Sequence, residues 1–90
     1  MQALHDNAAA GRYELAMPEG VGFATYRDAG GVRSILHVET PAAARGKGRA
    51  AALMAAIVAD ARARGLKLDP VCSYAVAYFR RHPNATDVCA

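Results

Sequence analysis

Pro41–Ala50 reads P-A-A-A-R-G-K-G-R-A and stands between a strand-like run and an alanine-rich helical run. Two glycines alternate with three cations at the position where the helix is expected to begin. Free backbone N–H groups and the macrodipole make a helix N-terminus partly positive, and glycines let an anion approach the backbone closely. The stretch therefore predicts a strand–turn–helix unit that holds a phosphorylated ligand.

The composition predicts one small, mildly basic domain. The 90 residues leave little room for a second core, and 11 Lys and Arg against 8 Asp and Glu give a net charge of +3. This charge suits a phosphate-bearing small molecule. The interleaved aromatic and basic residues of an RNA-binding sheet are missing, so nucleic acid is disfavoured as a partner.

The cysteines and the N-terminus bear on location. No run approaches the roughly 20 apolar residues that span a bilayer, so no membrane association is expected. The start, MQALHDNAAAG, lacks the pattern of a signal peptide, which favours the cytoplasm. Cys72 and Cys89 lie outside any C-x-x-C spacing. We therefore expect reduced thiols and no metal site, with a disulfide between them as the less favoured alternative.

The first half of the chain predicts an antiparallel meander. Residues 1–10 are expected to be a flexible lead-in to a domain formed by residues 11–90. Apolar residues then alternate with polar ones, which is typical of strands. Turn signals at Pro18–Gly20 and Ala29–Gly31 separate three such strands, the last of which is Val32–Thr40.

The second half predicts a helix, a strand and a second helix. Helix formers fill Arg49–Arg64, Leu66–Val71 reads as a strand, and Ser73–Arg81 reads as a helix. The order β-β-β-α-β-α is that of an α+β fold. Its crossover helix should place the fourth strand parallel to the third.

The glycine turn matches two other nucleotide-binding motifs poorly. A P-loop requires G-x-x-x-x-G-K-S/T, but here the lysine lies between the glycines and no Ser or Thr follows. The dinucleotide fingerprint G-x-G-x-x-A is met by Gly46, Gly48 and Ala51, with Asp69 about 20 residues further on, and it stays a weaker alternative. Its context is wrong, because an antiparallel meander precedes the turn and five residues separate the strand end from the first glycine.

A third pattern, R-x-x-G-x-A at Arg45, Gly48 and Ala50, resembles the pyrophosphate loop Q/R-x-x-G-x-G/A of the GNAT superfamily of acetyl-CoA-dependent N-acetyltransferases. Three flanking segments are similar to those of its short stand-alone branch. They are His37–Pro41 (H-V-E-T-P), Pro70–Tyr74 (P-V-C-S-Y) and Arg81–Pro83 (R-H-P). They occur in the expected order and extend the resemblance over residues 20–84.

The resemblance implies a minimal GNAT-like fold in which the third and fourth strands splay apart and acetyl-CoA lies in the gap. The pyrophosphate would bind the N–H groups of Arg45–Ala50, with the three cations of the turn supplying charge at its rim. The pantetheine arm would follow Leu36–Thr40, and the thioester would point toward Cys72. The residues expected to bind acetyl-CoA are Val38, Thr40, Arg45, Gly46, Lys47, Gly48, Arg49, Ala50, Cys72, Tyr78 and Phe79.

Acetyl transfer to an amine needs a base for the amine and an acid for the departing thiolate. Strand alternation places His37 and Glu39 on one face of the third strand. We expect Glu39 to be the base, directly or through water, with His37 as the second candidate. The alternatives are a sheet histidine with satisfied hydrogen bonds and a surface carboxylate.

The residue that would protonate the departing thiolate differs from the family pattern. Many GNAT enzymes use a tyrosine seven residues after an asparagine at a strand end, and Phe79 and Cys72 take these two positions here. Phenylalanine has no proton to donate, so we expect water or Cys72 to take this role. Cys72 lies at a strand–helix junction and is also a candidate acyl acceptor. The alternative is a small residue that packs beside CoA.

The resemblance also implies an open acceptor site, because the helices that wall it in full-length GNAT domains are missing. The acceptor amine is therefore expected on a protein or another large molecule, or else a homodimer partner completes the wall.

Two other functions stay open. One is a CoA or acyl-CoA binding module without catalysis, favoured by the missing tyrosine, and the weaker one is a basic module that binds nucleic-acid phosphates through Arg45–Arg49.

Overall fold

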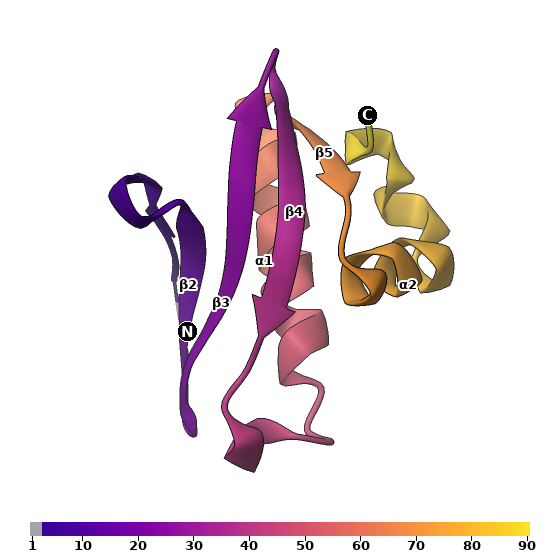
Figure 1. Cartoon of the computed structure of the whole chain (residues 1–90). Helices are drawn as coiled ribbons and strands as arrows, with labels where there is room; N and C mark the ends of the chain where they lie inside the picture. Colours follow the sequence, from indigo (N-terminus) through magenta and orange to yellow (C-terminus); the bar gives the residue numbers. More distant parts are fainter. Residues whose placement is uncertain (1–2) are drawn as a thin grey trace.

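The computed structural model describes residues 3–90, which form one five-stranded sheet and two α-helices (Figure 1). The strands are β1 (Leu4–Asn7), β2 (Arg12–Met17), β3 (Gly20–Ala29), β4 (Val32–Glu39) and β5 (Lys67–Pro70), and the helices are α1 (Arg49–Arg64) and α2 (Ser73–Arg81). Short 3-10 helices cover Ala8–Ala10 (η1), Ala42–Ala44 (η2) and Pro83–Val88 (η3). The strands lie in sequence order, antiparallel except for the parallel pair β4–β5. The predicted α+β order is confirmed from β2 onward.

The N-terminal segment adds a strand that the sequence did not reveal. The prediction of a flexible lead-in over residues 1–10 is wrong for residues 4–10, and residues 1–2 lie outside the described part of the chain. β1 pairs with β2 along its whole length, and its Leu4 packs against the core. Asn7 then caps η1. Because β1 contains a single apolar residue, no alternating pattern identifies it as a strand.

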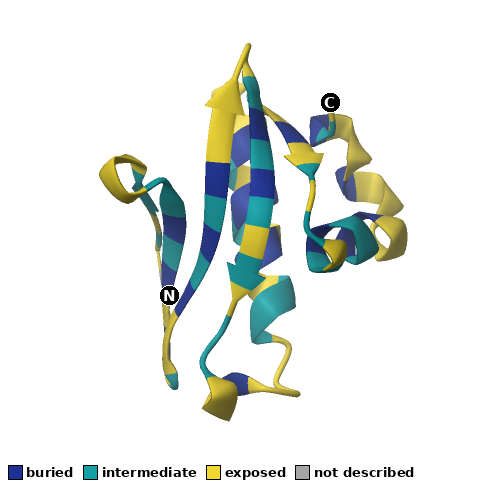
Figure 2. Cartoon of the chain, in the orientation of Figure 1, coloured by how far each residue is buried: buried dark blue, intermediate teal, exposed yellow. Residues whose placement is uncertain are grey.

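The core lies between one face of the sheet and the two helices. Figure 2 shows buried positions that alternate with more exposed ones along β3 and β4, as expected for strands with one face covered. The buried residues of the strands and both helices form a single cluster: Tyr13, Leu15, Met17, Ala24, Tyr26, Ile35, Leu53, Met54, Ile57, Val58, Ala61, Leu68, Ala75, Tyr78 and Phe79. Within residues 3–90 no helix covers the opposite face of the sheet, which is the face turned toward the viewer in Figure 1.

A β-bulge in β4 reorients the end of that strand. Thr25 pairs with His37 and Tyr26 pairs with Ile35, so Leu36 is an extra residue without a partner on β3. The bulge changes the alternation, because Ile35 points into the core whereas His37 points to the uncovered face. After the bulge, the side chains of β4 therefore alternate in the opposite phase from those before it.

The parallel pair β4–β5 ends early and the two strands then separate. Pairing runs from Val32↔Lys67 to Ile35↔Pro70, whereas β4 continues to Glu39. The N–H groups that follow β5, those of Val71 and Cys72, both donate to the Ile35 carbonyl, at 3.0 and 3.2 Å. This carbonyl marks the fork, and Figure 1 shows the chain after β5 turning away toward α2. The predicted splay of the third and fourth strands, observed as β4 and β5, is confirmed.

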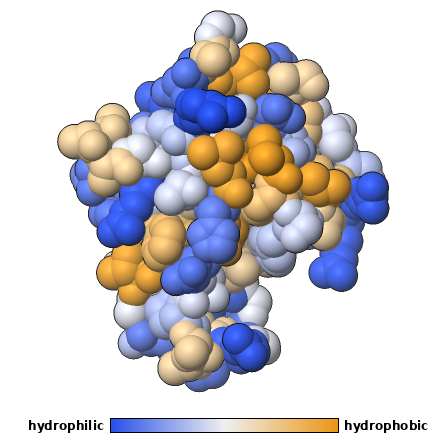
Figure 3. Space-filling model, viewed as in Figure 1, coloured by the Kyte–Doolittle hydropathy of each residue, from blue (hydrophilic) through white to orange (hydrophobic). Residues whose placement is uncertain are grey.

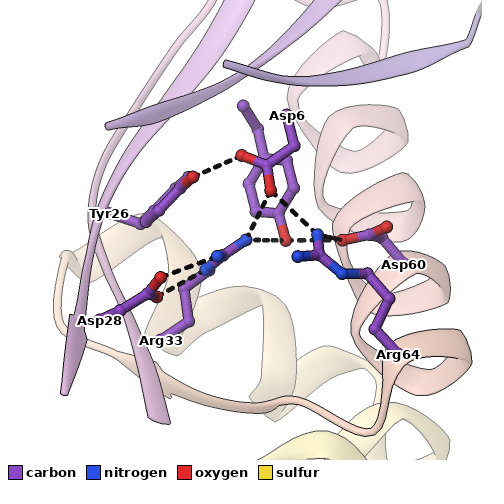
Figure 4. Close-up of polar contacts among 7 residues, drawn as sticks. Asp6, Tyr26, Asp28, Arg33, Asp60 and Arg64 are labelled. Atoms are coloured by element: carbon purple, nitrogen blue, oxygen red, sulfur yellow. Dashed lines mark hydrogen bonds and ion pairs between the residues drawn. The ribbon is translucent and has the colours of Figure 1, made fainter. Parts of the chain in front are cut away.

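An ion network ties the other end of the sheet to α1 (Figure 4). Arg33 is 4% exposed, donates twice to Asp28, at 2.7 and 2.8 Å, and donates to Asp6 at 3.0 Å and Tyr13 at 2.9 Å. Its guanidinium also lies 3.9 Å from the centre of the Tyr26 ring, a cation–π contact. The network continues to Asp60 and Arg64 of α1. It joins four strands to the helix, β1 included.

Candidate functional site

Two glycines shape the turn between β4 and α1. Gly46 and Gly48 have φ angles of 79° and 71°, in the left-handed region that other residues adopt only with strain. A Cβ atom at either position would meet nothing within 4 Å. The space beside both glycines is therefore open, and the backbone is accessible to a ligand.

Backbone N–H groups without partners gather at this turn. Gly48 is the N-cap of α1 and has no side chain to cap the helix. The amides of Gly46, Gly48 and Arg49–Ala51 make no hydrogen bond within residues 3–90, and the first bond of the helix is donated by Ala52 to the Gly48 carbonyl at 3.1 Å. These donors and the helix macrodipole make the turn suited to an anion.

Two of the three cations of the turn are paired within the protein. Glu19, in the turn between β2 and β3, accepts hydrogen bonds from Nε and Nη2 of Arg49 at 2.9 and 3.1 Å and lies 3.5 Å from Nζ of Lys47. Its side chain is only 9% exposed, and the bonds from Arg49 lower the pKa of the Glu19 carboxyl to about 2. Glu19 therefore offsets one of the two positive charges that Lys47 and Arg49 bring to the rim.

A cavity of about 330 Å³ lies between the glycine turn and α2. Its lining is Thr40, Ala44, Arg45, Gly46, Gly48, Arg49, Ala50, Ala51, Tyr74 and Arg81. Six of these ten residues are among those predicted to bind acetyl-CoA: Thr40, Arg45, Gly46, Gly48, Arg49 and Ala50. Tyr74 and Arg81 were missed as site residues. Their spacing of seven positions on one helix, which places both on one side of α2, is the signal that could have found them.

The two residues predicted to act as the general base, His37 and Glu39, lie next to each other on the uncovered face of the sheet. Nε2 of His37 lies 3.1 Å from Oε1 of Glu39, and the side chains are 58% and 59% exposed. The ring of Phe23 on β3 flanks the imidazole at 6.3 Å between centroids. Both side chains are therefore accessible to a second substrate that approaches this face.

Cys72 lies on the other arm of the fork. It is the N-cap of α2, and its Sγ accepts a hydrogen bond from the N–H of Ala75 at 3.3 Å. The residue is half-buried and packs against the core, and its thiol is free, as is that of Cys89. All three predicted catalytic residues thus lie at or beyond the point where β4 and β5 separate.

Of the other residues predicted to bind acetyl-CoA, some line the cavity and others pack in the core. Thr40 lines the cavity, and Val38 packs partly against the core. Tyr78 and Phe79 are 7% and 6% exposed, do not line the cavity, and belong to the core. Tyr78 stacks instead on the His82 ring, with 4.1 Å between centroids. Contacts of Tyr78 and Phe79 with a ligand stay predictions, because core packing already accounts for both side chains.

Neither a metal-ligand cluster nor a membrane-spanning helix is found among residues 3–90. Among residues 3–90 no three His, Cys, Asp or Glu side chains group as a metal site requires. No helix in the described part of the chain is long and apolar enough to cross a membrane. Figure 3 shows apolar and polar side chains intermixed on the face seen in Figure 1. Among residues 3–90, Val21 and Val71 are the large apolar residues that are exposed, at 53% and 54%.

Comparison with known proteins identifies one family. A family model described as GCN5-related N-acetyl-transferase matches residues 12–88. The fold is similar to the NMR solution structure of a GCN5-like protein from Staphylococcus aureus, with a TM-score of 0.68 and 22% sequence identity over 97% of this chain and 86% of that one. No functionally curated protein matches the chain. The structural likeness extends to β1, which lies outside the match to the family model.

Proposed function

The chain belongs to the GCN5-related N-acetyltransferase family, and from that membership we propose that it transfers an acetyl group from acetyl-CoA directly to an amine. The observation that carries this proposal is the fork between β4 and β5, which opens beside the unpaired N–H groups at the start of α1. An extended ligand with a diphosphate at one end and a reactive group at the other matches these two features.

Acetyl-CoA would lie along β4 from the glycine turn to the fork. Its diphosphate would accept hydrogen bonds from the amides of Gly46, Gly48 and Arg49–Ala51. The pantetheine arm would pair with the backbone of Leu36–Thr40, which has no β5 partner. The thioester would then reach the fork, close to Cys72.

The His37–Glu39 pair would serve as the base. At a rise of about 3.3 Å per residue, His37 lies roughly 7 Å and Glu39 roughly 13 Å beyond Ile35 along β4. The proton of the amine would pass to His37 and from it to Glu39, whose Oε1 lies 3.1 Å from Nε2 of His37. The amine nitrogen would bond to the thioester carbonyl carbon, the C–S bond would break, and the CoA thiolate would leave.

Cys72 or water would protonate the departing thiolate. The position of the family tyrosine is occupied by Phe79, which is buried and has no proton to give. Cys72→Ala should therefore lower turnover while leaving the affinity for acetyl-CoA nearly unchanged. Unchanged turnover would assign the proton transfer to water and Cys72 to packing alone.

The acceptor would be an amine on a large molecule. The pair of candidate base residues is more than half exposed on a sheet face that no helix of residues 3–90 covers. An exposed lysine side chain or a protein N-terminus reaches such a face without needing an enclosed pocket. A homodimer partner that completes this face stays a prediction.

A non-catalytic CoA-binding module is the second candidate. The substitution of phenylalanine for the family tyrosine favours it, because the cradle for the diphosphate is kept while the usual proton donor is lost. The two candidates make the same prediction for binding and opposite ones for thiol release.

Two measurements test the proposal in order. CoA or acetyl-CoA at 100 times its Kd should stabilise the fold by about 2.7 kcal/mol in a thermal-shift assay. Thiol release from acetyl-CoA with peptide and polyamine acceptors should then be reduced in Glu39→Gln and His37→Gln. His5→Gln is the matched control, since His5 is exposed on the same sheet face but on β1, three strands away. Binding without thiol release would favour the second candidate, and no binding would contradict both.

A further inference from the structure

Some of the cations near the cavity are paired with an acidic residue and others are not. CoA carries phosphate in two places, a diphosphate and a phosphomonoester on the 3′-hydroxyl of its ribose, and both are anionic at neutral pH. The glycine turn has the three cations that the sequence suggests for these groups, but Glu19 holds two of them, Lys47 and Arg49. A cation outside the turn would therefore add to the charge available for the second phosphate.

Two arginines of the lining have no carboxylate partner. Within residues 3–90, neither Arg45 nor Arg81 lies within 4.0 Å of an acidic side chain, and both are exposed at the cavity. Arg45 belongs to the glycine turn itself. Arg81 comes from the last turn of α2, on the wall that faces the turn.

Tyr74 and Arg81 both line the wall of the cavity that α2 forms. The two residues lie seven positions apart on α2 and line the same wall. Burial raises the pKa of the Tyr74 phenol, and the charge of Arg81 acts in the opposite direction, consistent with a guanidinium near this ring. Stabilising the C-terminal end of α2 does not explain why Arg81 faces the cavity, since the neighbouring Arg80 has the same charge at the same helix end.

We propose that Arg81 binds the 3′-phosphate of CoA and makes the protein selective for CoA over its 3′-dephosphorylated form. This inference rests on the proposed function. The free amides of the glycine turn suit the diphosphate, and Arg81 is a separate donor on the opposite wall, whose planar guanidinium matches a phosphomonoester in a two-pronged geometry. Arg45 lies at the turn and supplements the charge there.

The test compares two ligands in three proteins. Titration calorimetry at one low ionic strength gives the Kd values of CoA and dephospho-CoA for wild type, Arg81→Gln and Arg80→Gln. Wild type should prefer CoA by about tenfold, the size of one charge-assisted contact at a partly exposed site. Arg81→Gln should remove that preference by weakening CoA alone, and Arg80→Gln, the matched loss of charge, should keep it.

The outcomes separate this inference from the proposed function. Equal affinity of wild type for the two ligands, or equal weakening of both by Arg81→Gln, would overturn the role of Arg81 while leaving CoA binding intact. Loss of the preference in Arg80→Gln as well would also overturn the role of Arg81, because the total positive charge at the end of α2 would then account for the preference. Failure of wild type to bind either ligand would overturn the proposed function itself. Circular dichroism of Arg81→Gln verifies that the exposed substitution leaves the fold unchanged.

Discussion

Arg33→Met removes the centre of the ion network that joins β1, β2, β3 and β4 to α1. Methionine keeps much of the aliphatic length of arginine but has none of its N–H donors. Arg33 is 4% exposed and donates to Asp28 at 2.7 and 2.8 Å, to Asp6 at 3.0 Å and to Tyr13 at 2.9 Å. In the variant Tyr13 and Asp6 lose a donor in a place that water reaches poorly, whereas Asp28 is more exposed.

The expected loss follows from how far the acceptors are buried. Removing one partner of a buried ion pair costs about 3–5 kcal/mol. We expect about 3 kcal/mol, because the Asp28 side chain is 54% exposed and Arg64 still donates to Asp6 at 2.9 Å. At about 4–8 °C per kcal/mol for a domain of this size, the thermal midpoint should fall by roughly 12–24 °C.

Urea and thermal unfolding followed by circular dichroism measure this loss. Arg12→Met is the matched control, since Arg12 forms an ion pair with Glu14 at 2.7 Å but its side chain is 38% exposed on the uncovered sheet face. Exposed ion pairs contribute little, so the control should lower the midpoint far less. Equal midpoints for the two variants would refute the reasoning, because burial of Arg33 would then have no energetic consequence.

Two further predictions concern the glycine turn. Gly48→Asp should weaken CoA binding by about 100-fold or more, since a carboxylate would face the diphosphate, whereas Gly48→Asn, which tolerates the same φ of 71° without a charge, should bind far better. Equal affinity of the two variants in calorimetry would move the diphosphate elsewhere. The pKa of Glu19 is lowered from 4.5 to about 2 in the fold, so its ion pairs stabilise the protein above about pH 4.5 and are lost as the pH falls toward 2. Glu19→Gln should therefore melt below wild type at pH 7, and the gap should close by pH 2; a gap that does not change with pH would count against the ion pairs.

Periodicity and turn chemistry predicted most of the fold. The residues that α1 buries recur at helical spacing in the sequence: Leu53, Met54, Ile57, Val58 and Ala61. The bounds of α1 and α2 match the prediction, and β2 ends at Met17, directly before the predicted turn Pro18–Gly20. β1 was not predicted, since four residues with one apolar side chain carry no alternation and the strand is held by Asp6 in the ion network.

The site was predicted where chemistry is local in sequence, and missed where it depends on packing. The His37–Glu39 contact follows from alternation within one strand, and the open backbone at Gly46 and Gly48 follows from glycine at a helix start. The pairing of Glu19 with Arg49 joins residues 30 positions apart and has no local signal. The same holds for Arg81, which reaches the cavity only because α2 lies across from the glycine turn.

The central claim is that CoA lies along β4 with its diphosphate at the start of α1. The most direct measurement is a titration of ¹⁵N-labelled protein with CoA, followed through the backbone amide resonances. The account predicts saturable shifts at the unpaired amides of Gly46, Gly48 and Arg49–Ala51, and along Leu36–Thr40, where β4 has no β5 partner. No shift at millimolar CoA, or shifts confined to the surroundings of His82, would contradict it.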